Sequence, residues 1–111
     1  MRLDWWLKKQ DHMYRLKSSL RTRLWYALKA KQWYKNSEFN TYIGCSKKEL
    51  ELHIESQFKE GMTWDNYGEW EIDHIKPLSI AETENEMYKL CHYTNLQPLW
   101  KSANRKKYNK Y

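Results

Sequence analysis

A row of leucines at intervals of four residues places the strongest constraint on the fold of this chain. Its members are Leu16, Leu20, Leu24 and Leu28. Residues four apart lie on one face of an α-helix, and neither Gly nor Pro interrupts residues 1–43. The pattern predicts helix over residues 3–35, with the leucines in the core. Apolar mass is added by Trp5, Trp6, Trp25 and Trp33. A break near residues 10–14 would divide the segment into two helices.

The charge distribution indicates a polyanionic partner. Residues 1–35 hold ten Lys and Arg against two acids, residues 36–99 hold five against twelve, and residues 100–111 hold five against none. Two basic ends around an acidic middle suggest that a polyanion is held from two sides. The basic side chains expected to contact phosphate from the first segment are Arg15, Arg21 and Arg23. The alternative is a solvated helical surface with scattered basic residues.

Size and composition indicate a single compact domain. The chain has 111 residues, and its seven Trp and nine Tyr supply much of the apolar bulk. Cys45 and Cys91 form no CxxC pair, which disfavours a zinc ribbon; we expect two buried thiols, with one disulfide as the alternative. No apolar run resembles a signal peptide or a membrane span, so we expect a cytoplasmic protein.

The middle of the chain predicts a connection, a second helix and a loop. Residues 36–44 resemble a connection. Ser46 followed by Glu49 is a capping box, and the helix that it begins carries Leu50, Ile54 and Phe58 on one face. Gly61 is the expected end of that helix. Turn-forming residues over 62–70 then predict a loop.

The last third predicts a strand, a long connection, a second strand and a helix. Residues 69–75 alternate between apolar and acidic side chains, which predicts a strand that Pro77 ends. A second capping box, Thr83 with Glu86, begins a short helix. The residues that it would bury are Met87, Leu90 and Cys91. A strand over residues 94–100, with Leu96 and Leu99 as core candidates, precedes a basic helix from Ser102 and a fraying tail at residues 108–111.

The polar residues of this last third form a recognisable motif. It reads Asp73-His74-Ile75-Lys76-Pro77-Leu78-Ser79, then Asn95-Leu96-Gln97-Pro98-Leu99, then Asn104 three residues before Lys107. The motif resembles that of the HNH endonucleases, and residues 44–68 also resemble small phage-encoded members of that family. The resemblance covers about residues 42–108. It implies an α+β fold, mainly helical, with a ββα-metal finger in the C-terminal half. Residues 1–41 would be a basic helical segment and residues 42–111 the nuclease core.

The resemblance implies a role for each polar position. Asp73 and Asn104 would bind the metal, His74 would be the general base, and Asn95 would hold the loop that carries His74 through hydrogen bonds to the backbone. The family often has His where this chain has Asn104. Phosphate contacts next to the cut are expected from Lys76, Arg105, Lys106 and Lys107. His74 and Asp73 are adjacent, so they can share one phosphate only if the strand bends or ends there.

The residue types suit phosphodiester hydrolysis. An imidazole with an ordinary pKa of about 6.5 can take a proton from water near neutral pH. Asp and Asn offer hard oxygen ligands, which favour one Mg²⁺ or Mn²⁺ ion over Zn²⁺. Such an ion stabilises charge on the phosphoryl oxygen and on the departing 3′ oxygen. By resemblance, the products would carry a 5′ phosphate and a 3′ hydroxyl.

Three functions remain open from the sequence. The first is a DNA endonuclease that nicks or cuts both strands, in the host cytoplasm if a phage encodes it. The second is a DNA-binding module of the same fold without catalysis. The third is an accessory subunit that acts with other phage packaging proteins.

Overall fold

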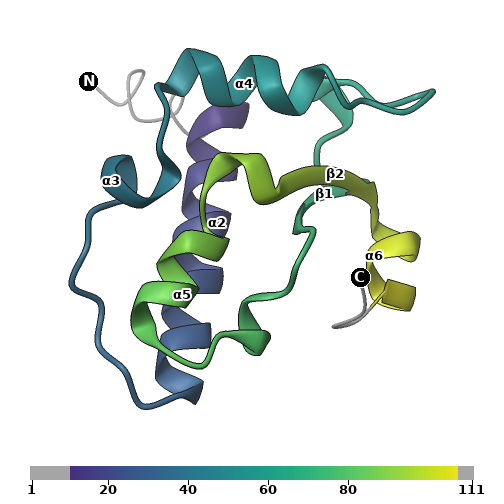
Figure 1. Ribbon diagram of the computed structural model, residues 1–111. Helices are drawn as coiled ribbons and strands as arrows, with labels where there is room; N and C mark the ends of the chain where they lie inside the picture. The colour runs from purple at the N-terminus through teal and green to yellow at the C-terminus, as the bar shows by residue number, and fades with distance from the viewer. Residues whose placement is uncertain (1–10, 108–111) are drawn as a thin grey trace, which may run out of the picture.

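The computed structural model describes residues 11–107, which form a mixed helical and stranded fold (Figure 1). Its helices are α2 (His12–Ala30), α3 (Phe39–Ile43), α4 (Lys47–Glu55), α5 (Glu84–Leu90) and α6 (Lys101–Lys107), and its strands are β1 (Trp70–His74) and β2 (Leu96–Trp100). The expectation of an α+β fold is therefore confirmed. The expected start of the first helix, with Trp5 and Trp6, and the tail at residues 108–111 lie outside the described residues.

The leucine row is the buried face of α2, as its spacing predicts. Leu16, Leu20, Leu24 and Leu28 are each at most 4% exposed. Asp11 caps the helix, because its side chain accepts a hydrogen bond from the Met13 N–H at 2.9 Å.

The prediction that helix continues to residue 35 is wrong. The helix ends at Ala30, and Gln32 adopts a left-handed conformation with φ of 62°. The Gln32 N–H donates to the carbonyl of Lys29 and the Trp33 N–H donates to that of Leu28, which is the hydrogen-bond pattern of a Schellman cap. Glycine usually occupies the left-handed position, so a glutamine there gave no sequence signal.

The connection expected over residues 36–44 contains a short helix, α3. Phe39, Tyr42 and Ile43 are buried together on one side of it, which compensates for its length of five residues. The helix ends at Gly44, where φ is 76°. A Cβ at Gly44 would overlap with the His92 imidazole, so this position requires glycine for space as well as for conformation.

Helix α4 begins where the sequence predicts and ends earlier. The capping box is present: the Glu49 N–H donates to Ser46 Oγ at 3.0 Å, and the Ser46 N–H donates to Glu49 Oε1 at 2.9 Å. The helix ends at Glu55, so Phe58 lies beyond it and Gly61 does not terminate it.

Phe58 instead joins an aromatic cluster around Trp70, which is fully buried. The rings of Phe58, Trp64 and Tyr67 lie with centroids 4.8 to 5.4 Å from the Trp70 ring. Trp70 Nε1 donates to the Thr63 carbonyl at 2.8 Å and to Asn66 Oδ1 at 2.9 Å. The first residue of β1 therefore anchors the loop that precedes it.

Strands β1 and β2 pair antiparallel, with Trp70 opposite Trp100 and His74 opposite Leu96. On the buried face, Ile72 and Leu96 are inaccessible to solvent. Leu99 is only half-buried, contrary to its prediction as a core residue. It lies three positions from Leu96, and side chains that differ by an odd number of positions point to opposite faces of a strand.

The second capping box is only half formed. The Glu86 N–H donates to Thr83 Oγ1 at 3.1 Å, but the Glu86 carboxylate accepts from the Glu82 N–H and not from that of Thr83. Helix α5 buries Met87, with Cys91 at its C-cap and Leu90 only half-buried. Cys91 and Cys45 are free thiols, so the disulfide alternative is not realised.

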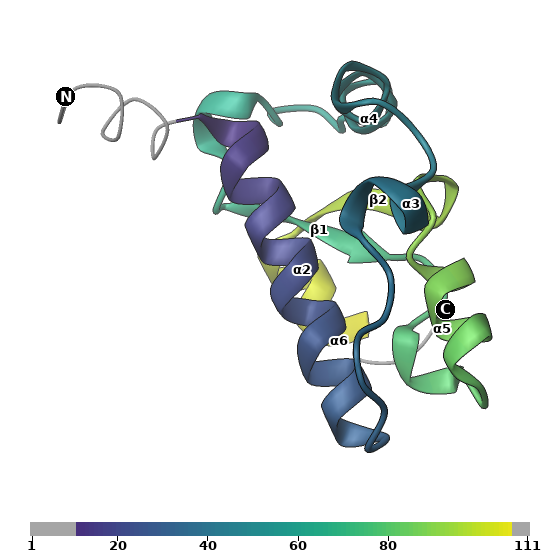
Figure 2. The ribbon, with the colours of Figure 1, turned by 90° about the vertical axis from the view of Figure 1, so that its left-hand side faces the viewer.

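Helix α2 runs beside β1, and α6 leads directly out of β2 (Figure 2). Two arginines link α2 to the chain around β1: Arg15 donates to the Tyr67 carbonyl at 3.2 Å, and Arg23 donates to the Ile72 carbonyl. Helix α6 contacts both strands. The end of β1 is therefore enclosed by α2 on one side and by α6 on another.

We predict that Ser46→Ala lowers the free energy of unfolding by about 1 kcal/mol, because it removes the Oγ that accepts from the Glu49 N–H, while the backbone N–H that donates to Glu49 Oε1 remains. Urea denaturation followed by circular dichroism would measure it. Ser18→Ala, in the exposed middle of α2, is the control and should change stability by less than about 0.5 kcal/mol. Equal effects of the two substitutions would contradict the proposed importance of the cap.

Candidate functional site

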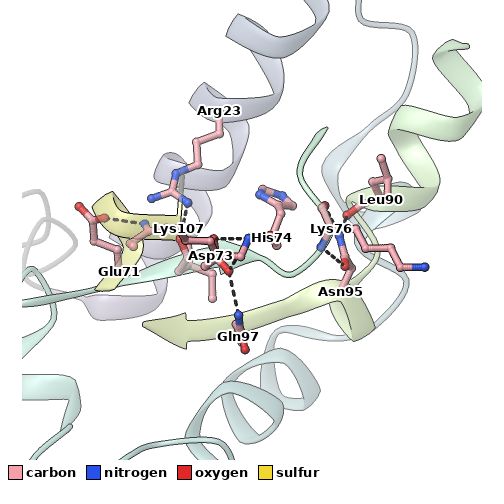
Figure 3. Close-up of polar contacts among 11 residues, drawn as sticks. Arg23, Glu71, Asp73, His74, Lys76, Leu90, Asn95, Gln97 and Lys107 are labelled. Carbon is pink, nitrogen blue, oxygen red and sulfur yellow. Dashed lines mark hydrogen bonds and ion pairs between the residues drawn. The ribbon is translucent and has the colours of Figure 1, made fainter. Parts of the chain in front are cut away.

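A depression of about 560 Å³ lies at the end of β1, between α2 and α6. Its polar lining residues are Arg23, Glu71, Asp73, His74, Ser79, Asn104, Arg105 and Lys107. Three of the four residues predicted for catalysis and metal binding are therefore brought together: Asp73, His74 and Asn104. Figure 3 shows Asp73 and His74 at the end of β1. Two carboxylates and three basic side chains share this lining.

Asp73 is 6% exposed and is held from two sides. Gln97, its partner in the strand register, donates from Nε2 to Asp73 Oδ2 at 2.9 Å. The Lys107 ammonium lies 3.4 Å from both carboxylate oxygens. A buried carboxylate requires such compensation, and here a cation from α6 provides it.

His74 is the last residue of β1 and is 8% exposed. The strand ends there, and the Ile75 N–H donates to the Asn95 carbonyl at 2.8 Å. Asp73 and His74 are both residues of β1, and both line the same depression at its end.

Burial, together with the smaller effects of the positive charges of Arg23 and Lys107, lowers the pKa of His74 to about 3. The imidazole is therefore neutral at physiological pH, with a nitrogen lone pair available to accept a proton. Phosphate entering the depression would offset the charges of Arg23 and Lys107, which would make the imidazole more basic.

Asn95 lies outside the lining of the depression and makes the backbone hydrogen bonds that the resemblance implies. Its Nδ2 donates to the carbonyls of Lys76 at 3.0 Å and Leu90 at 2.7 Å, and its Oδ1 accepts from the Lys76 N–H at 3.0 Å. These bonds fix the chain two residues after His74.

Glu71 is the site residue that sequence reasoning missed. Asn104 Nδ2 donates to Glu71 Oε1 at 2.8 Å, which brings a second carboxylate beside the predicted ligands. The sequence did indicate Glu71, because it lies two residues from Asp73 and therefore on the same face of β1. Gln97 was also missed, although it lies opposite Asp73 in the strand register.

The predicted phosphate-binding residues have different environments. Arg21, Lys76, Arg105 and Lys106 are exposed, and Arg105 lines the depression. Arg23 also lines the depression, and its guanidinium donates a hydrogen bond to the Ile72 carbonyl of β1. Arg15 is exposed but packs over the Tyr67 ring, outside the depression. Lys107 is largely buried, and its ammonium donates to the His74 carbonyl at 3.0 Å as well as to Asp73.

The oxygen donors suit a hard divalent cation, with one condition. Asp73, Glu71 and the Asn104 amide are hard ligands, but the Lys107 ammonium already contacts Asp73, so a metal ion must displace it. Within residues 11–107, no group of three or more His, Cys, Asp or Glu side chains is arranged to hold a metal. A metal here would take its remaining ligands from water and substrate.

Comparison with known proteins identifies relatives without an assigned activity. No protein-family model and no solved structure matches the chain. It is similar to two proteins of Acanthamoeba polyphaga mimivirus. Uncharacterized protein L246 is 34% identical over 100 residues, which cover 87% of this chain and 43% of L246. Uncharacterized protein L426 is 37% identical over 92 residues, which cover 80% of this chain and 40% of L426. The chain thus spans about two-fifths of the curated relatives that it matches. No helix in the described part is long and apolar enough to cross a membrane.

We predict that His74 makes the protein less stable as the pH falls from 7 to 5. The unfolded chain binds a proton near pH 6.5 that the folded chain, with a His74 pKa of about 3, does not bind, so acid favours unfolding in this window. The free energy of unfolding should fall by about 2 kcal/mol more in the wild type than in His74→Gln. Urea titrations at both pH values would measure this difference. Parallel pH dependence in the two proteins would show that His74 is not buried in a neutral form.

Proposed function

We propose that this protein is a metal-dependent endonuclease of the HNH type that hydrolyses DNA phosphodiester bonds, with residues 70–107 as its ββα-metal finger. The observation that carries the proposal is the lining of one depression by Asp73, His74 and Asn104. The backbone hydrogen bonds of Asn95 also support the proposal, because the motif implies such bonds for this residue. Fold alone would not support a function, but this combination of a base, ligands and cations does.

In the proposed reaction, different residues of the depression bind the phosphate and accept the proton. Arg23, Arg105 and Lys107 attract the phosphate, and His74 accepts a proton from a water molecule. The water oxygen bonds to phosphorus as the bond to the 3′ oxygen breaks, and the 3′ oxygen takes a proton from solvent. The products are a 5′ phosphate and a 3′ hydroxyl.

Asp73 and Asn104 would hold one Mg²⁺ or Mn²⁺ ion, and Glu71 is close enough to Asn104 to join them. When bound, the ion supplies positive charge for the phosphoryl and leaving oxygens. The two protein ligands of the motif suit Mg²⁺, which usually keeps several waters and takes further ligands from substrate phosphate.

A second candidate is a DNA-binding module of the same fold without catalysis. The contact between Lys107 and Asp73 favours it, because an ammonium already neutralises the carboxylate that would bind metal. The third candidate, an accessory subunit acting with packaging proteins, draws support from the viral source of both relatives. It predicts a stable protein complex and weak DNA affinity for the isolated chain.

We predict that supercoiled plasmid is converted to nicked or linear DNA with Mg²⁺ or Mn²⁺ and remains intact with EDTA. His74→Ala should reduce the cleavage rate at least about 100-fold, in line with loss of a general base, while DNA affinity stays unchanged. Gel electrophoresis and fluorescence anisotropy would measure the two effects. Cleavage by His74→Ala at the wild-type rate would refute its role as the base. Metal-independent binding without cleavage by the wild type would favour the non-catalytic module.

We also predict opposite effects of two substitutions on metal binding. Asp73→Ala should weaken Mn²⁺ binding about tenfold or more, because a negatively charged ligand is lost. Lys107→Met should strengthen it, because the ammonium that competes for Asp73 is removed while the length of the side chain is kept. Isothermal titration calorimetry measures both. Unchanged affinity in Asp73→Ala would place the metal elsewhere.

A further inference from the structure

The C-terminal half of α2 and the residues after it expose a group of aromatic side chains. Trp25 is 49% exposed, Tyr26 is 63% exposed and Tyr34 is 86% exposed. The rings of Trp25 and Tyr26 contact each other edge to face, with centroids 4.9 Å apart. Such a cluster of exposed rings is a candidate binding surface, since the core does not need it.

Basic side chains surround these rings. Arg21, Trp25 and Lys29 follow each other at intervals of four residues, which places them in one row on α2. The Lys29 ammonium lies 4.7 Å from the centroid of the Trp25 ring. Helix α2 contains no acidic residue, so this surface is suited to an anionic and aromatic ligand.

Trp25 and Lys35 both line two depressions. The larger, of about 680 Å³, also contains Lys29 and Tyr34. The smaller, of about 240 Å³, also contains Arg21 and Tyr42. The Tyr42 side chain is buried, and its hydroxyl has no hydrogen-bond partner among residues 11–107. Trp25 thus borders two depressions, and each of them also contains basic side chains.

This surface is continuous with the candidate site around α2. Arg23 lines the depression that contains Asp73, and Tyr26 follows Arg23 by three residues and so is its neighbour on the helix surface. Tyr26 in turn contacts Trp25. Figure 2 shows α2 in front of the sheet and α6, with one long side uncovered by other helices. A chain-like ligand can therefore pass from Arg23 over Tyr26 to Trp25.

We propose that the aromatic and basic residues Arg21, Trp25, Tyr26, Lys29, Tyr34 and Lys35 bind single-stranded nucleic acid, with bases stacked on Trp25 and Tyr26 and phosphates paired with the basic side chains. A duplex hides the faces of its bases, whereas a single strand exposes them, so rings flanked by cations favour the single strand. Only the continuation of this strand into the candidate site rests on the proposed nuclease function. The substrate of that site would then be a nucleic acid with an unpaired segment beside the cut.

The test is fluorescence anisotropy with a labelled single strand of mixed sequence and with the same strand annealed to its complement. All measurements contain EDTA, so binding is measured whether or not the protein cleaves. Trp25→Leu removes the ring but keeps apolar bulk, and Trp25→Phe keeps a ring. Tyr26→Leu is an independent second variant. Leu52→Ala, at an exposed apolar position of α4, is the control.

Trp25→Leu and Tyr26→Leu should each weaken single-strand binding about tenfold and duplex binding less than about twofold. Trp25→Phe should retain most of the affinity, and Leu52→Ala all of it. The proposal is overturned if the wild type does not bind the single strand, if neither leucine variant weakens its binding, or if single-strand and duplex affinities fall equally. Absence of plasmid cleavage with intact single-strand preference would refute the nuclease and leave this surface as a binding site.

Discussion

The antiparallel pairing of β1 with β2 is the constraint on which the candidate site depends. It sets Gln97 opposite Asp73 and ends at His74, where the backbone turns away. Asn95 then fixes the turn by bonding both backbone groups of Lys76. At its other end the pairing is anchored by Trp70, which is buried among aromatic rings. A shift by one residue in this register would exchange the faces of every side chain on β1.

The enclosure of that strand end explains the chemistry of the depression. Arg23 from α2 and Lys107 from α6 are both directed to the end of β1, one to the Ile72 carbonyl and the other to Asp73. Their charges and the burial of His74 all lower the pKa of the imidazole, which keeps it neutral. A site that holds cations beside carboxylates in this way is suited to a ligand that brings negative charge of its own.

The parts of the fold that the sequence anticipates are those with a repeating or paired signal. The leucine row of α2 and the Ser46 capping box each depend on neighbours in the chain, and each is present. The alternation in the sequence also predicts strand β1 correctly, although Asp73 and His74 are both buried in it. The ends of helices were less predictable. Gln32 terminates α2 in a conformation that glycine usually marks, and α3 depends on the burial of its rings.

In the candidate site, too, the sequence predicted the residues that belong to a local pattern and missed the contacts that depend on tertiary packing. Asp73, His74 and Asn104 could be selected because they belong to a motif, and Glu71 could have been added by strand alternation. The contact between Lys107 and Asp73 joins residues 34 positions apart, and no local pattern reveals it. Tertiary packing alone determines which cation reaches a buried carboxylate.

Helix α6 carries both Asn104, which donates to Glu71, and Lys107, which contacts Asp73, so a single turn brings a candidate ligand and a competing cation to the same depression. In the proposed nuclease, a nucleic acid whose phosphate draws Lys107 away from Asp73 leaves that oxygen pair open to a divalent ion. Thermodynamic linkage then requires the ion to tighten nucleic-acid binding by the same factor. The divalent ion and the nucleic acid would therefore bind cooperatively. In the free protein, Lys107 would take the place of the ion beside Asp73.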